Sequence, residues 1–124
     1  MLFRSDEFSN ILDDYYEYDK NLQDQLVRLR DLILTKKDLL QNSEKLRELE
    51  RNLTLFHADV VTQSLKKYRE PIDLIGFHGQ TILHNPREKI TFQLGDGKLL
   101  SQIVKKKVIY DFRKADIKIG RAHV

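Results

Sequence analysis

The sequence contains no cysteine and no tryptophan, and its two prolines and five glycines are few for 124 residues. Without cysteine, the chain cannot form disulfides, thiolate zinc sites or a cysteine nucleophile. The absence is compatible with a reducing compartment, and we expect a cytoplasmic protein. No segment approaches the roughly 20 apolar residues that span a bilayer, and no signal-peptide core follows the first residues. We therefore expect no membrane partner.

Charge is plentiful, but neither sign dominates. Charged residues make up 33% of the chain, hydrophobic residues 40%, and the formal net charge is +3. This length and composition are typical of one globular domain or part of one. Lys105–Lys107 form a basic run, yet acidic residues are interspersed in the predicted helices and no aromatic stacking motif accompanies the lysines. We expect a solvated junction there and no nucleic-acid partner; a basic helical interaction or nucleic-acid-binding module stays the alternative function.

The two ends of the chain resemble translated sequencing adapter. The adapter sequence ATC GGA AGA GCA CAC GTC encodes residues 119–124. The reverse complement of that adapter encodes residues 1–5 when its GTG serves as a start codon. We expect residues 1–5 and 119–124 to be adapter-derived and residues 6–118 to be native; native termini are the alternative. Removing Arg4 and Arg121 leaves 20 basic against 19 acidic residues, a net charge of +1.

Two segments repeat apolar residues at helical spacing. The first predicts a helix over residues 20–35. The second predicts a helix that begins at the N-cap Ser43 and ends near Lys67, before Pro71. Its apolar seam covers only about two heptads, so packing on a domain core is favoured over a coiled coil. The residues of this seam are Leu46, Leu49, Leu53, Phe56 and Val60.

The remaining apolar segments are short enough to be strands or single helical turns. Together with the two helices they predict a mixed α/β domain. We expect strands at 6–18, 72–77, 90–94 and 108–110, a hairpin loop at 84–89, and a short helix over 99–104.

Three polar groups each follow an apolar segment. They are His78-Gly79-Gln80-Thr81, Gly95-Asp96 and Asp111-Phe112-Arg113. Because ligands bind at the carboxyl ends of strands in open α/β sheets, these groups can converge on one crevice. Gln, His and Asp exchange hydrogen bonds with hydroxyls, and Arg grips a carboxylate through two parallel bonds, which suits a sugar. Simple turns are the alternative interpretation.

These residues resemble the anhydro-N-acetylmuramic acid kinase family. The family shows I-G-x-H-G-Q-T, T-x-Q-x-G-D and V-x-x-D-F-R-x-x-D in this order and at these intervals. The matching segments here are Ile75–Thr81, Thr91–Asp96 and Val108–Asp116. Three ordered motifs over roughly residues 53–116 are far more specific than a lone glycine-rich loop, whereas residues 6–52 fit more loosely.

The resemblance implies part of the N-terminal domain of the sugar kinase, Hsp70 and actin (ribonuclease H-like) fold. It implies a cytoplasmic enzyme that uses ATP and Mg²⁺ to convert 1,6-anhydro-N-acetylmuramic acid to N-acetylmuramate 6-phosphate during cell-wall recycling, and it leaves a homodimer open. Carried over by position, the residues bordering the sugar would be His78, Gly79, Gln80 and Thr81. Arg113 would face its carboxylate, with Asp96 and Asp111 in support.

Several family motifs have no counterpart in this sequence. The phosphate loop G-x-M-S-G-T-S-x-D-G, the G-G-Q-G-A-P-L continuation after Asp116, and the D-T-G-P-G-N segment with the catalytic Asp are all absent. Phosphoryl transfer requires nucleotide, metal and base to be positioned together. We therefore expect this chain to bind no cofactor, to contain no catalytic residue of its own, and to be inactive alone.

Two other classes of site were weighed against this assignment. A metal site from His57, His78 and His84 is not favoured, because no pair has i,i+4 spacing on one helix and no carboxylate completes a signature. His57 is expected to be an exposed or a satisfied histidine. A helical interaction module built on Leu46–Val60 is the third alternative.

Overall fold

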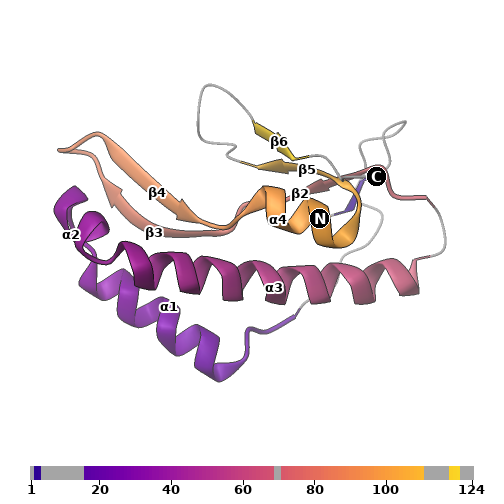
Figure 1. Cartoon of the computed structure of the whole chain (residues 1–124), viewed down its shortest axis with the longest axis horizontal. Helices are drawn as coiled ribbons and strands as arrows, with labels where there is room; N and C mark the ends of the chain where they lie inside the picture. The colour runs from indigo at the N-terminus through magenta and orange to yellow at the C-terminus, as the bar shows by residue number, and fades with distance from the viewer. Residues whose placement is uncertain (1, 4–15, 69–70, 111–117, 121–124) are drawn as a thin grey trace.

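The computed structural model describes residues 2–3, 16–68, 71–110 and 118–120, and places four helices against two small sheets in these parts of the chain (Figure 1). The mixed α/β class expected from the sequence is confirmed. None of the described helices has the length and apolar content needed to cross a bilayer. The elements in chain order are β1 (Leu2–Phe3), α1 (Lys20–Leu32), α2 (Lys36–Gln41), α3 (Ser43–Lys67), β2 (Leu74–Gly76), β3 (Gln80–Asn85), β4 (Ile90–Leu94), α4 (Gly97–Val104), β5 (Lys107–Tyr110) and β6 (Lys118–Gly120).

The two sheets differ in their pairing. The larger has the strand order β1-β2-β5-β6, in which β2 and β5 run parallel and the two outer strands antiparallel to their neighbours. The smaller is the antiparallel β3–β4 hairpin. The hairpin and α4 together form the connection between β2 and β5, because parallel strands need a long crossover. As a result, the chain leaves the larger sheet at the carboxyl end of β2 and returns to it beside the amino end of β2, where Lys107 pairs with Leu74.

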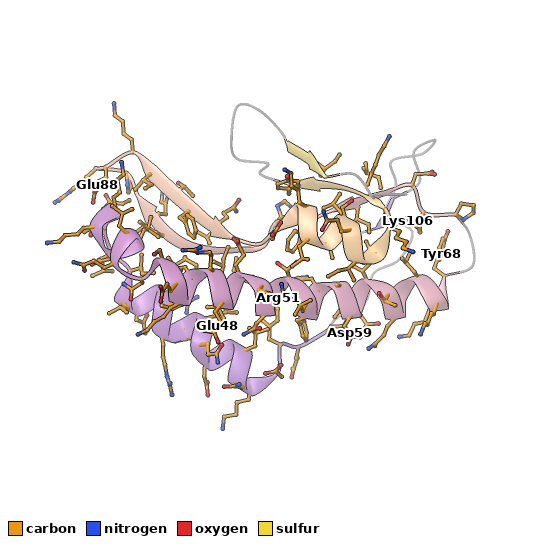
Figure 2. The ribbon with its side chains drawn as sticks, viewed as in Figure 1. Glu48, Arg51, Asp59, Tyr68, Glu88 and Lys106 are labelled. Carbon is orange, nitrogen blue, oxygen red and sulfur yellow. The ribbon has the colours of Figure 1, made fainter. Side chains whose placement is uncertain are left out.

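Helix α3 runs beneath both sheets and joins their cores (Figure 1). Its N-terminal half packs against α1 and the hairpin through Leu46, Leu49 and Leu53, which are all buried. Its C-terminal half packs through Ala58 against β2, α4 and β5. Glu48 and Asp59 project from the side of α3 that faces away from the sheets (Figure 2). The predicted seam therefore packs on the core of its own domain.

The helix ends depart from the sequence predictions in local ways. Helix α1 ends at Leu32, because Ile33 is already extended while its side chain stays in the core. The short α2 was missed, since residues 36–41 have no apolar period; a capping box between Thr35 and Asp38 begins it. Ser43 is the first residue of α3, not its N-cap, which is Asn42. The predicted end at Lys67 is confirmed.

The strand predictions are correct in part. The strands at 90–94 and 108–110 are confirmed, and the short helix is confirmed with an earlier start at Gly97. The hairpin loop predicted at 84–89 is shorter, because β3 continues to Asn85, and the strand at 72–77 is reduced to Leu74–Gly76. Strand β3 was not predicted, because its first residues, Gln80 and Thr81, were assigned to a loop; the buried pair Ile82 and Leu83 anchors it to the core. Of the strand predicted at 6–18, residues 4–15 lie outside the described ranges, and Tyr16–Tyr18 have no regular secondary structure.

Candidate functional site

The predicted polar residues meet where the two sheets join. After β2, the backbone N–H of Phe77 still donates to the carbonyl of Ile109, at 2.9 Å, so the parallel pairing extends one residue beyond the strand. The chain then turns through His78 and Gly79 into β3, which pairs with β4 from Gln80 opposite Leu94 onward. The carboxyl ends of β2 and β4 therefore lie beside each other, as the sequence argument required.

Two glycines allow this close approach. Gly79 has φ +65°, in the left-handed region, and a Cβ added to it would lie 2.0 Å from the carbonyl oxygen of Leu94. Across from it, Gly95 has φ +151°, and a Cβ there would lie 3.0 Å from the Phe77 ring and 3.2 Å from the Gly79 Cα. A side chain at position 79 would push the two turns apart, so glycine there is a packing requirement.

Asp96 begins helix α4 and is held by α3. Its carboxylate accepts from the backbone N–H of Leu99 at 3.0 Å, as an N-cap does. Its own N–H donates at 3.0 Å to the hydroxyl of Thr54, which is fully buried. The N–H of Gly95 donates at 3.1 Å to the carboxylate of Glu50. Two side chains of α3 thus fix the turn after β4, and Asp96 acts by positioning that turn.

A small hollow lies at this junction. His78, Gly79, Gln93, Gly95 and Tyr110 contribute to its walls, so it includes the end of β5 as well. Its volume is about 10 Å³, roughly that of one water molecule. The described residues around this hollow therefore do not form a complete sugar pocket.

Gln80 and Thr81 make side-chain contacts on two different partners. The amide of Gln80 donates to the hydroxyl of Tyr18 at 2.8 Å. The hydroxyl of Thr81 lies 3.5 Å from the amide nitrogen of Gln93, on the neighbouring strand. His78, between the strands, is exposed. The four residues predicted to border the sugar therefore lie together, and a hydrogen bond to Tyr18 connects Gln80 to the interior.

Behind the turn, aromatic rings enclose His57. Its ring packs edge-on against Phe77 with centroids 5.0 Å apart, and against Tyr18 and Phe56 at 5.7 and 5.9 Å. Burial lowers the pKa of the His57 imidazole from 6.5 to about 4, so it is neutral at pH 7. Its Nε2 lies 3.0 Å from the hydroxyl of Tyr18. Of the two alternatives weighed for His57, the satisfied histidine is confirmed.

The hydroxyl of Tyr18 is the central group of this hydrogen-bond chain. Burial raises the pKa of Tyr18, against the opposing effect of the hydrogen bond from Gln80, so the phenol keeps its proton at neutral pH. Since the hydroxyl accepts from Gln80, its own proton can go to Nε2 of His57. We therefore assign the His57 proton to Nδ1, from the hydrogen bonds.

Sequence reasoning missed four residues that support the predicted site, namely Tyr18, Glu50, Thr54 and His57. Their contacts with the turns join residues 39 to 62 positions apart, as in His57 with Tyr18 and Tyr18 with Gln80. No spacing rule connects such distant positions. The one signal in the sequence was that polar Thr54 and His57 directly follow the seam residues Leu53 and Phe56. Asp111 and Arg113 lie outside the described residues.

Other features of the described part of the chain do not point to a sugar. No three His, Asp or Glu side chains there gather closely enough to hold a metal ion. A larger groove of about 340 Å³ lies between α2, α3 and β4, but its mainly apolar walls suit a polyol poorly, and it contains none of the predicted site residues. The basic run occupies the turn from α4 to β5, with Lys105 and Lys107 exposed.

A known family matches nearly the whole chain. The family model described as "Anhydro-N-acetylmuramic acid kinase" matches residues 1–122. The chain belongs to the anhydro-N-acetylmuramic acid kinase family. The family resemblance expected from the three motifs is thereby confirmed, and the junction described above carries the family's I-G-x-H-G-Q-T and T-x-Q-x-G-D segments in this chain.

Three relatives that bear the family's name show how much of the family this chain represents. The protein of Pelagibacter ubique is 49% identical over 122 residues, which are 96% of this chain and 32% of the relative. The protein of Rhizobium etli is 39% identical over 106 residues, 83% of this chain and 29% of the relative. The protein of Brucella canis is 45% identical over 87 residues, which are 68% of this chain and 23% of the relative. The chain therefore spans about a third or less of these relatives.

Proposed function

We propose that the full-length protein containing this chain is an ATP-dependent kinase that converts 1,6-anhydro-N-acetylmuramic acid to N-acetylmuramate 6-phosphate. The reaction consumes the anhydro sugar, ATP and water, and yields the phosphosugar and ADP. Membership of the family, with 49% identity to a named relative over 96% of this chain, carries the proposal. We place the protein in the cytoplasm, in peptidoglycan recycling, with a homodimer as the assembly to be tested.

For the fold, we propose the N-terminal domain of the sugar kinase, Hsp70 and actin (ribonuclease H-like) fold, of which this chain is a part. The parallel pair β2–β5, with the hairpin and α4 in the connection between its strands, supports this assignment. The sequence boundaries remain our proposal as well: residues 6–118 native, and residues 1–5 and 119–124 adapter-derived. The family match includes residues 1–5, so sequencing the genomic locus across both junctions decides this point.

Within the enzyme, we assign one wall of the sugar site to this chain. His78, Gly79, Gln80 and Thr81 form that wall, and Asp96 holds the turn opposite them. Hydroxyl-rich ligands are bound by such directional donors and acceptors. ATP, when bound, supplies the phosphoryl group, and Mg²⁺ accompanies it; the family motifs that would hold them have no counterpart in this sequence. We assign both to parts of the enzyme outside this chain.

The direct test uses the full-length protein, purified and supplied with the anhydro sugar, ATP and Mg²⁺. We expect one ADP for each N-acetylmuramate 6-phosphate formed, with the product identified by mass spectrometry. The control omits the sugar and should leave ATP unconsumed. The 124-residue chain alone should form no product, because it lacks the phosphate loop and the catalytic Asp of the family. ATP consumption that does not depend on the sugar would refute the proposal.

We also predict a strong effect of Arg113→Ala in the full-length enzyme. If Arg113 binds the carboxylate of the sugar through two charge-assisted bonds, its loss should lower kcat/KM for the sugar at least about tenfold. Arg113→Lys should recover only part of this, since a lysine presents a single ammonium. The control is Lys114→Ala, which removes the neighbouring charge. Steady-state kinetics indistinguishable from the wild type would exclude this role for Arg113.

A further inference from the structure

A chain of hydrogen bonds links three segments that are distant in sequence. The amide of Gln80 on β3 donates to the hydroxyl of Tyr18 at 2.8 Å, and this hydroxyl lies 3.0 Å from Nε2 of His57 on α3. Tyr18 itself lies just before α1 and packs edge-on against Phe56, with ring centroids 5.0 Å apart. Three segments thus meet at one phenol oxygen, and Gln80 is the member that belongs to the proposed sugar site.

His57 also supports the turn formed by His78 and Gly79 from the side of Phe77. Its ring packs on Phe77, the residue before His78, with centroids 5.0 Å apart. Through Tyr18 it reaches Gln80, the residue after Gly79. The two residues between them, His78 and Gly79, are thus held on both sides by one buried imidazole. A turn held at both ends keeps its backbone in one conformation.

Burying a phenol and an imidazole beside a hydrophobic core is costly unless both are hydrogen-bonded. An apolar pair would fill the same space without that cost, so packing alone does not account for these residue types. Tyr18 and His57 have in common that both belong to a chain of hydrogen bonds that ends at Gln80. A fixed amide is worth more to binding than a mobile one, because the side-chain entropy is already lost before the ligand arrives.

We propose that Tyr18 and His57 are positioning residues that hold Gln80 and the His78–Gly79 turn in the sugar-binding arrangement. The inference rests on the proposed function and extends it to two residues outside the family motifs that we identified. Neither residue touches the sugar in this proposal; both act through Gln80 and Phe77. Their loss should therefore weaken sugar binding and leave ATP binding unchanged.

The test is a double-mutant cycle in the full-length enzyme. Tyr18→Phe removes the hydroxyl and keeps the ring, and we expect it to raise KM for the anhydro sugar about fivefold, the effect of one hydrogen bond. KM for ATP and kcat should stay within about twofold. Gln80→Ala should raise the sugar KM about tenfold. The double variant Tyr18→Phe/Gln80→Ala should match Gln80→Ala, because Tyr18 acts through Gln80.

Two further variants separate positioning from packing. His57→Phe keeps an aromatic ring but no acceptor, so it should resemble Tyr18→Phe. His57→Gln keeps an acceptor and should restore the sugar KM to within about twofold of the wild type. The matched control is Tyr16→Phe, which removes an exposed hydroxyl that accepts from Lys67 at 3.2 Å and should change neither KM.

The outcomes distinguish this inference from the proposed function. An inactive wild-type enzyme refutes the function itself. An active enzyme in which Tyr18→Phe keeps the wild-type sugar KM refutes the positioning role. A lower melting temperature and a smaller active fraction with unchanged KM would show a purely structural role and refute it too. Calorimetric titration with the sugar in the absence of ATP provides the same comparison without turnover.

Discussion

Gly79→Ala should lower the free energy of unfolding of the full-length protein by about 3–5 kcal/mol, the sum of backbone strain and a steric clash. The φ of +65° belongs to a region that alanine adopts only at a cost. In addition, the new Cβ would lie 2.0 Å from the carbonyl oxygen of Leu94 and 2.9 Å from its carbon. Both are backbone atoms, so no rotamer change can relieve the contact.

The same substitution should also damage the site. To accommodate a Cβ, the turn after β2 must separate from the end of β4, where Gln80 pairs with Leu94. Urea unfolding and sugar KM measured on the same preparation test both effects. For the unfolding measurement, the control is Thr81→Ala, two residues away in the strand, which should cost less than about 1 kcal/mol. Unfolding of Gly79→Ala at the wild-type urea concentration would contradict the close approach of the two turns.

The second large effect concerns His57 and pH. Its pKa is lowered by burial from 6.5 to about 4, so between these values the unfolded chain binds a proton that the folded chain does not. The contribution of His57 to the free energy of unfolding is therefore fully present above pH 6.5 and is lost as the pH falls toward 4. At pH 5 the loss should be about 2 kcal/mol relative to pH 7.5.

The comparison with a variant isolates this contribution. The free energy of urea unfolding is measured at pH 7.5 and pH 5 for the wild type and for His57→Gln, which cannot titrate. The variant should lose about 2 kcal/mol less than the wild type over this interval. Phe92→Leu changes a partly buried ring of the hairpin core and leaves the rings around His57 in place, so it should retain the wild-type pH dependence. An equal loss in the wild type and His57→Gln would mean that His57 is not desolvated as described.

The helices and the hairpin were predictable because their signals are local. The apolar spacing of Leu46, Leu49 and Leu53 predicted α3 over nearly all of its length, and the same signal predicted most of α1. Helix α2 was not predictable from periodicity, since it has no buried residue and depends on its capping box. Strand β3 was hidden because its polar first residues, Gln80 and Thr81, read as part of a turn.

The structure brings together the described part of the predicted site and adds contacts that the motifs do not indicate. Ordered motifs placed His78–Thr81 and Gly95-Asp96 at strand ends, and the pairing of Gln80 with Leu94 at the base of the β3–β4 hairpin explains why these two ends meet. The motifs carried no information on Tyr18, Thr54 or His57. Tyr18 and Thr54 bond to Gln80 and Asp96 across 62 and 42 positions. His57 packs on Phe77 and lies within hydrogen-bond distance of Tyr18. Such contacts depend on how α3 crosses beneath both sheets, which no local pattern specifies.

The sequence by itself determined the family of this protein, its mixed α/β class and the location of its candidate site, because ordered motifs and apolar periods depend only on residues near one another. The tertiary structure alone decided that Gly79 must lack a side chain and that His57 is neutral. The tertiary structure also brings the hydroxyl of Tyr18 within hydrogen-bond distance of the Gln80 amide. These properties arise from burial and close approach between distant segments, and therefore exist only once α3, the hairpin and the parallel strands are packed together.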